Sequence, residues 1–242
     1  MASSEAVEIL RQGAEPWNAW RQEQGTNPTD TPDGGLAGSD FSETVLGGVD
    51  LGHLDLTGII LRGAYLSRSC FRSACLEGAD LSEAYLKGAD LEGADLTRVN
   101  MNDAFLTRAI LRGVVLVDGT LRDTNLRAAD LRGAKLSNAD LEGAFLKDTD
   151  LFESDLSESK LVGAKLVGAK LQKARLAQAQ LGHADLRRAL LQDADLRGAD
   201  LRDADLRSAH LDRANLEGAN LEGARLEAAI VQGARFGGAR LG

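Results

Sequence analysis

The sequence predicts an all-β solenoid, a coil of short extended segments and corners that runs from about residue 34 to residue 242. Three observations lead to this prediction. An apolar residue recurs every five positions, a small residue recurs two positions before it, and aromatic residues make up only 4% of the chain. The core of an ordinary globular domain is filled by varied large side chains. A chain whose apolar residues are mostly Leu and Ala must pack the same few side chains together many times, which indicates a repeat architecture.

The apolar column comprises the central residues of 42 consecutive units, at positions 36, 41, 46 and so on to 241. Leu occupies 37 of these positions, and we expect Leu91, Leu131 and Leu201 to be typical members of the structural core. The residue two positions earlier is Ala in 28 units. Residues i and i+2 of an extended segment point the same way, so both columns should face inward. The residue before the centre is Asp or Asn in 18 units and the second residue after it is Gly in 17, which is typical of turns.

Units such as Ala89-Asp90-Leu91-Glu92-Gly93 and Ala199-Asp200-Leu201-Arg202-Asp203 resemble the A(D/N)LXX pattern of the pentapeptide-repeat family. The resemblance covers about 85% of the chain. It implies a right-handed quadrilateral parallel β-helix with four units per coil. Residues 34–242 would then form about ten and a half coils. At a strand spacing of about 4.8 Å, the rod would be on the order of 50 Å long.

Residues 1–33 lie outside the repeat and contain all three prolines. Ser4 can cap a helix from Glu5 to Gln12 that stops at Gly13, and Pro16 can start a second helix that reaches Gln24. Trp17 and Trp20 are three residues apart and so share a face of this second helix. We interpret the segment as an α-helical N-terminal cap and linker, because the open end of a β-helix has unpaired strands that need cover. A ligand site built on the two tryptophans is the alternative.

Composition and motifs argue against an enzyme. A rod filled with Leu offers no pocket for an activated nucleophile or an acid–base pair, and the chain has no phosphate-binding loop and no His/Cys metal spacing. We therefore predict no catalytic residues, no metal and no cofactor. Cys70 and Cys75 should lie on adjoining faces as ordinary thiols. A formal charge of −9 disfavours nucleic acid and anionic membranes, and we expect a cytoplasmic protein without membrane contact.

With four units per coil, residues 20 positions apart stack on one face, and the outward charges can be sorted. The face with centres 46, 66, 86 and so on to 226 has a net charge of +6, whereas the other three faces have −3, −6 and −2. This basic face also carries an aligned outward column of aromatic residues. The candidate partner-binding residues are Tyr65, Tyr85, Phe105, Phe145, Arg68, Lys87, Arg108, Arg127, Lys147, Arg187 and Arg207. Arg127 and Lys147, like Arg187 and Arg207, stack as like charges, which should be mildly destabilising.

The basic face admits two interpretations. Aromatic stacking and solvated charges could simply stabilise the sheet, or the face could dock an acidic protein partner, since exposed aromatics with Arg are enriched in interfaces. Single-stranded nucleic acid could use the same layout, but the acidic neighbouring faces disfavour it.

The leading functional hypothesis is a non-enzymatic interaction scaffold, a rigid rod that docks a protein partner of unknown identity through an outer face. The family resemblance suggests an alternative, a DNA mimic that binds or protects DNA gyrase. The acidic total favours this alternative. The absence of a C-terminal dimerisation helix and of any break in the register, together with the basic face, counts against it. The bare last units also suggest an end-to-end homodimer through the C-terminal coil.

Overall fold

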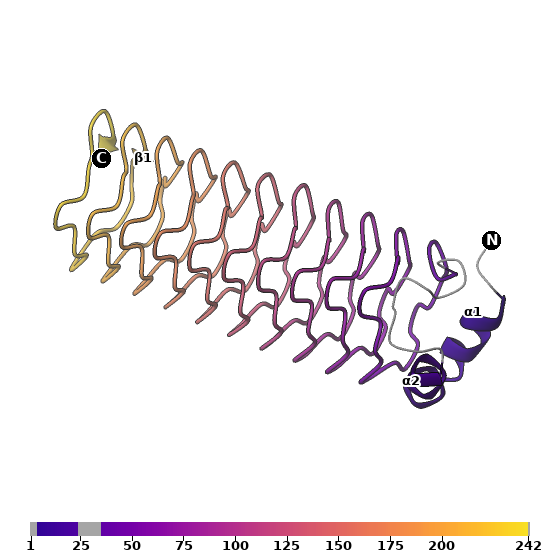
Figure 1. Cartoon of the computed structure of the whole chain (residues 1–242). Helices are drawn as coiled ribbons and strands as arrows, with labels where there is room; N and C mark the ends of the chain where they lie inside the picture. Colours follow the sequence, from indigo (N-terminus) through magenta and orange to yellow (C-terminus); the bar gives the residue numbers. More distant parts are fainter. Residues whose placement is uncertain (1–3, 24–34, 242) are drawn as a thin grey trace.

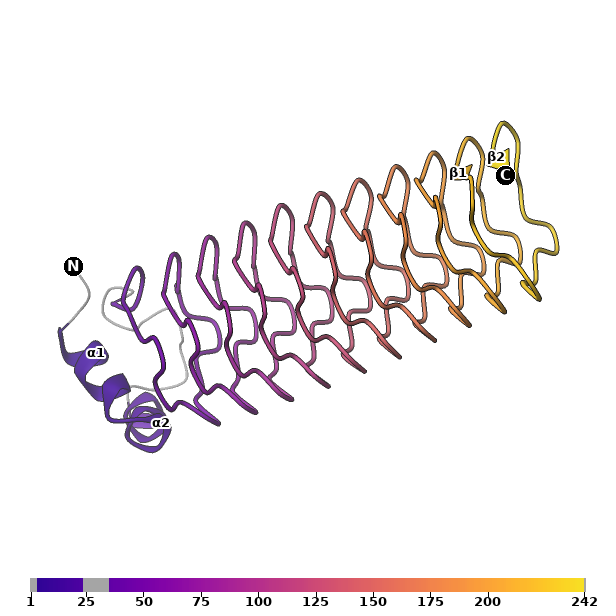
Figure 2. The same ribbon diagram turned by 180° about the vertical axis from the view of Figure 1, so that it is seen from behind.

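The computed structural model describes residues 4–23 and 35–241. Two short helices stand at one end of a long rod of stacked coils, and the coils follow one another in sequence order from the N-terminal to the C-terminal end (Figures 1 and 2). The helices are α1 (Ser4–Arg11) and α2 (Ala14–Glu23), and the strands that pair in parallel at the far end are β1 (Asn220–Leu221) and β2 (Arg240–Leu241). The expected boundary between residues 33 and 34 lies outside the described residues.

Both predicted helices are present, and each begins within two residues of its expected start. Helix α2 begins at Ala14, two residues before Pro16. Proline is tolerated there because the N–H groups of a helix's first turn have no intrahelical acceptor. Helix α1 begins at Ser4 rather than Glu5 and ends at Arg11, and Gly13 lies between the helices with a φ of 111°. The expected end of the second helix at Gln24 lies outside the described residues.

Each coil contains 20 residues, that is four five-residue units. Parallel bridges connect the residue before each centre with its equivalent 20 positions later, from Asp40 and Ile60 to Asn215 and Arg235. The unit around Leu66 illustrates the hydrogen bonds: Leu66 N–H donates to Tyr85 C=O of the next coil at 2.9 Å, and Tyr65 N–H donates to Thr44 C=O of the previous coil at 2.8 Å. The chain is therefore a parallel β-helix in which the backbone of each coil hydrogen-bonds to the backbone of the next.

The corners have the same backbone conformation in every unit. The second residue after the centre has a positive φ at all 41 positions from residue 38 to residue 238, and 24 of these residues are not glycine. The turn role predicted from glycine at this position is confirmed and extends to the whole array. Left-handed backbone is costly for residues with a Cβ, by about 1–2 kcal/mol each, so more than half of the corners hold this strain.

A side-chain hydrogen bond explains the Asp or Asn before the centre. In all 18 units that have one, its Oδ1 accepts the backbone N–H of the residue two positions later, as Asp40 does from Ser42 at 2.8 Å and Asp95 does from Thr97 at 3.0 Å. The backbone hydrogen bonds between successive coils do not use this N–H group. The side chain thus closes the corner locally.

The interior is solid. The central residues from Leu36 to Leu221 are buried, and Leu91, Leu131 and Leu201 have no exposed surface. Phe41, Phe71 and Met101 replace Leu without leaving the core. Where the small column is polar, the hydroxyl donates to a carbonyl, as Thr124 does to Met101 O at 2.7 Å. The predicted inward columns are therefore confirmed.

The two helices hydrogen-bond the first coils. Trp17 is 1% exposed, and its Nε1 donates to Asp50 O at 2.7 Å. Asn18 accepts the N–H of Asp50 at 2.8 Å and donates to Gly48 O at 3.0 Å. The ring of Trp20 lies 5.1 Å from that of Trp17, as their shared helix face predicts. The side chains of α2 thus satisfy backbone groups at this end of the rod.

Candidate protein-binding face

Stacked aromatic rings dominate the exposed surface of the basic face. Val45, Tyr65, Tyr85, Phe105, Asn125 and Phe145 follow one another in consecutive bridges. Tyr65, Tyr85 and Phe105 are 48, 40 and 42% exposed, although most apolar side chains of the rod are buried. Their rings stack face to face with centroids 4.8 and 5.0 Å apart. The predicted alignment of Tyr65, Tyr85, Phe105 and Phe145, hereafter the aromatic stripe, is therefore present in the structure.

Basic side chains border one side of the aromatic stripe. Lys87, Arg127 and Lys147 are exposed and belong to one column two positions after the stripe, hereafter the basic column. The Arg127 guanidinium lies 4.7 Å from the ring centroid of Phe145, a cation–π contact. Arg68 and Arg108 are exposed one position further from the stripe. Among the described residues, none of these five cations is within salt-bridge distance of a carboxylate.

Carboxylates border the other side of the aromatic stripe, where sorting the outward charges by face did not predict them. Glu83, Asp103 and Asp123, hereafter the acidic column, line a groove of about 670 Å³ together with Tyr85, Phe105, Asn125, Arg127 and Phe145. By their position in the repeat these carboxylates belong to the neighbouring face, because they precede the stripe across a corner. The corner brings them beside the rings. A signal was available, since they lie two residues before Tyr85, Phe105 and Asn125 in the sequence.

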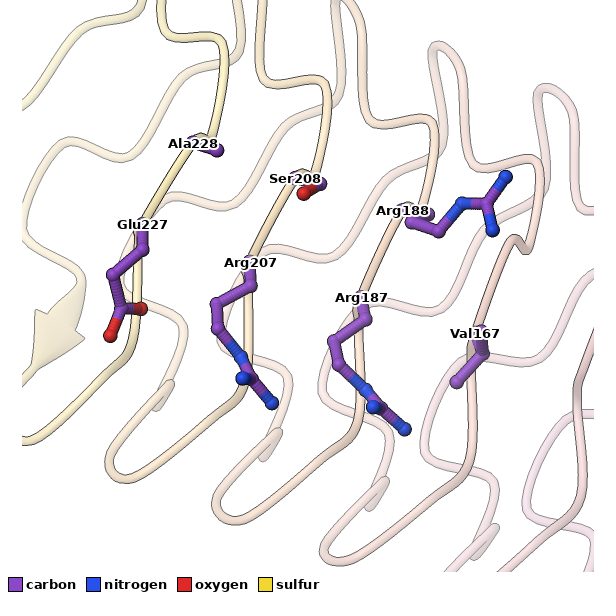
Figure 3. A pocket seen from close by; sticks show the side chains of 7 residues that line it. All are labelled: Val167, Arg187, Arg188, Arg207, Ser208, Glu227 and Ala228. Carbon is purple, nitrogen blue, oxygen red and sulfur yellow. The ribbon is translucent and has the colours of Figure 1, made fainter.

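Arg187 and Arg207 differ from the other predicted cations. Arg187 makes two hydrogen bonds with Asp185, at 2.8 and 2.7 Å, and Arg207 makes the equivalent pair with Asp205. Figure 3 shows their side chains extended in the same direction along a groove of about 510 Å³, with Arg188 pointing elsewhere. The hydrogen bonds from Arg187 hold the pKa of Asp185 below its usual range. Hydrogen bonding to Asp205 raises the pKa of Arg207 and outweighs the expected repulsion from Arg187, which acts in the opposite direction.

The free positive charge of the basic face consequently gathers around the aromatic stripe. Between residues 64 and 168 the face carries one acidic residue, Asp148, against six basic ones, Arg68, Lys87, Arg108, Arg127, Lys147 and Lys165. Towards the C-terminal end, Asp185 and Asp205 take the stripe positions and pair with arginines. The candidate surface thus lies between residues 64 and 168 and does not extend to the last coils.

The remaining predicted features lie apart from this surface. Cys70 and Cys75 are free, half-buried thiols, and burial raises the pKa of Cys70. Within residues 4–23 and 35–241, no cluster of three or more His, Cys, Asp or Glu side chains is arranged to hold a metal ion. In the same residues, no helix has the length and apolar character needed to cross a membrane.

Comparison with known proteins gives a family and several similar solved structures. The family model for pentapeptide repeats matches residues 39–78, 74–113, 109–148, 149–188, 169–207, 189–227 and 204–242. No curated protein matches the chain. Among solved structures, HetL from the cyanobacterium Nostoc sp. strain PCC 7120, a pentapeptide repeat protein involved in heterocyst differentiation regulation, is 38% identical. The match covers 80% of this chain and 90% of HetL with a TM-score of 0.53.

Two further structures are more distant. Another pentapeptide repeat protein from Nostoc PCC 7120, alr5209, is 37% identical over 36% of this chain and 84% of its own, with a TM-score of 0.32. QnrB1, a plasmid-mediated fluoroquinolone resistance protein, is 17% identical over 80% of this chain and 91% of its own, with a TM-score of 0.39. These two scores are too low to support an argument about function. The repeat pattern, the 20-residue coil and the family match together show that this chain belongs to the pentapeptide-repeat family.

Proposed function

We propose that this protein is a non-enzymatic interaction scaffold that docks a protein partner on the aromatic stripe and the cations beside it. The observation that supports the proposal most directly is the exposure of three stacked rings, Tyr65, Tyr85 and Phe105. They lie next to Lys and Arg side chains that have no carboxylate partner within the described part of the chain. Aromatic residues and arginine dominate the energetics of protein interfaces. The rod presents them on a rigid surface, so little conformational entropy is lost when a partner binds.

The exposure of the rings favours a binding role over a purely structural one. Each aromatic residue occupies the position where Asp or Asn would accept the corner N–H, a hydrogen bond with a net value of about 0.5–1.5 kcal/mol. Each stacked pair returns about 0.5–1.5 kcal/mol in addition to the burial of ring area. Tyr65, Tyr85 and Phe105 nevertheless remain 48, 40 and 42% exposed. Contiguous exposed apolar surface of this kind is typical of interaction sites.

The test is affinity capture from the native host with the triple variant Tyr65→Ala/Tyr85→Ala/Phe105→Ala. The matched control is Ile110→Ala/Leu190→Ala, because both residues occupy the equivalent outward position on another face. The wild type and the control should recover the same partner, and the triple variant should lose it while keeping its circular dichroism spectrum. Equal recovery by a folded triple variant would reject the docking surface.

The alternative function, a DNA mimic that binds DNA gyrase, has weaker support. Its only basis in this chain is the net charge of −9 on a rod, and the cations of the basic face interrupt the negative potential that a mimic needs. A supercoiling assay separates the two functions, since a mimic inhibits or protects gyrase at micromolar concentration. HetL is involved in regulating cell differentiation, and a regulatory role exerted through binding is the form of scaffold function that we propose for this chain.

Three structural proposals accompany this function. The first is that the coils are right-handed and have a quadrilateral cross-section. The second is that α1 and α2 cap the N-terminal end of the rod, with Trp17 and Trp20 as packing residues rather than a ligand site. The coil of residues 222–241, where Val231 is 42% and Leu241 is 61% exposed, pairs with a second copy. The protein acts in the cytoplasm, without a membrane or nucleic acid as partner.

A further inference from the structure

The aromatic stripe from Tyr85 to Phe145 lines a groove whose two walls carry opposite charge. On one wall, Glu83 pairs with Arg62 at 2.7 Å, whereas Asp103 and Asp123 have no salt-bridge partner among the described residues. On the other wall, Arg127 lines the groove and lies against the ring of Phe145, and Lys87 and Lys147 flank it in the same column. Both lysines are exposed, and neither has a carboxylate within salt-bridge distance among the described residues. A uniformly acidic or uniformly basic partner would meet repulsion at one wall. The geometry therefore favours a partner that is apolar in the middle and differs in charge at its two edges.

The spacing of the rings favours a helix over a strand as the occupant. The rings repeat every 4.8 to 5.0 Å along the rod. The apolar seam of an amphipathic helix repeats every 3.5 residues, or about 5.25 Å. This repeat distance is close to the ring spacing, so the two differ by only about 1–2 Å in total after four coils. Same-face side chains of a strand repeat about every 6.7 Å, so a strand falls out of register by a whole ring within three steps.

The groove also has a place for one larger side chain. The ladder of rings is interrupted at Asn125, which lies between Phe105 and Phe145 in the consecutive bridges. Asn125 lines the groove of about 670 Å³ together with both of these rings and with Asp123 and Arg127. A bulky apolar residue of the partner can fill the gap between the two rings, as the central residue of an interface commonly does.

We infer that the occupant of this groove is an amphipathic α-helix of the partner, acidic along one edge and basic along the other, with a bulky apolar side chain over Asn125. The inference rests on the proposed function and specifies its partner. The stretch from Tyr65 to Phe145 spans four coil spacings, about 20 Å, which corresponds to about 13 helical residues. The acidic edge of the helix lies along Lys87, Arg127 and Lys147, and the basic edge lies along Asp103 and Asp123.

The test uses three synthetic helical peptides with fluorescent labels. All have the same apolar seam with a central Phe, and their edges are Lys and Glu, Lys and Lys, or Glu and Glu. A single mixed peptide is sufficient, because a helix that reverses its direction exchanges its edges. Fluorescence anisotropy with the full chain should show that the mixed peptide binds at least tenfold more tightly than either uniform peptide. The same mixed peptide with two internal prolines should bind at least tenfold more weakly, because it cannot be helical.

Charge reversal of each wall completes the experiment. Asp103→Lys/Asp123→Lys should shift the preference to the Glu-edged peptide, and Lys87→Glu/Lys147→Glu should shift it to the Lys-edged peptide. An unchanged thermal midpoint would show that each variant is folded, as expected for exposed residues. Failure of all three peptides to bind, equal binding by all three, full binding by the proline peptide, or an unmoved preference would overturn the helix inference. In those cases loss of the host partner by the triple alanine variant would still support the docking surface itself.

Discussion

Replacing the glycine of one corner tests whether the left-handed backbone is a real constraint. Gly133 has a φ of 66°, and a Cβ added there would have no other heavy atom within 4 Å. The cost of Gly133→Ala is therefore conformational and not steric. A left-handed residue with a Cβ costs about 1–2 kcal/mol, and alanine returns about 0.4–1 kcal/mol by restricting the unfolded chain. We expect a net destabilisation of about 1 kcal/mol.

The reverse and the control substitutions make the test specific. Ala128 holds the same corner position with a φ of 54°, so Ala128→Gly should be neutral or stabilise the protein by up to about 1 kcal/mol. Gly182 does not have a positive φ, and a Cβ there would lie 3.7 Å from Arg202 O, an ordinary contact. Gly182→Ala should therefore stabilise by about 0.4–1 kcal/mol. The reasoning would be refuted if urea unfolding gave Gly133→Ala the same sign as Gly182→Ala.

Four further predictions concern the core, the ion pairs, the helices and the C-terminal coil. Leu131→Asp buries a carboxylate in a solid interior and should cost at least about 4 kcal/mol, with faster hydrogen exchange in the adjoining coils. Hydrogen bonds from Arg132 are the main reason that the pKa of Asp130 falls to about 2. This pKa lies below the unfolded value of about 3.9, so the pair stabilises the fold above about pH 4 and the contribution disappears as pH falls towards 2. Solvent screening limits it to about 1 kcal/mol. Arg132→Gln should raise that pKa in an NMR titration and flatten the acid limb of the stability curve. Trp17→Phe removes the hydrogen bond to Asp50 O and should cost about 1 kcal/mol by urea unfolding, whereas an unchanged midpoint would argue against the cap. Light scattering at micromolar concentration should give twice the monomer mass of 25.7 kDa, and the monomer mass would contradict the end-to-end homodimer.

The interior of the rod could be predicted almost completely from the sequence, because its causes are local. Leu131 and its equivalents recur without a break, so each unit repeats the same choice of inward and outward positions. The Asp or Asn of a unit accepts a hydrogen bond from the N–H only two residues later, so its role is also contained within one unit. The glycines signalled the corners, but their conformation proved independent of glycine, since Ala128 adopts it as well.

The composition of the candidate site depended on the tertiary structure. Counting every twentieth residue placed Tyr85 and Phe105 in one column. It did not show how close a side chain before a corner lies to the rings after it. The sequence places Asp103 and Asp123 two residues before Phe105 and Asn125, but the left-handed corner that brings them beside the rings is seen only in the fold. The hydrogen bond from Asn18 of α2 to Gly48 O of the rod likewise became visible only in the fold.

Periodicity in the sequence therefore determined what points inward and how the coils stack, since both follow from interactions that recur within five or twenty residues. The tertiary structure decided which outward columns share a surface and which charges remain free. Arg187 was neutralised by Asp185, whereas Lys87 was left without a carboxylate partner among the described residues. The pairing of Arg187 follows from contacts within its own unit, whereas the surroundings of Lys87 depend on how neighbouring columns meet across the corners and between coils.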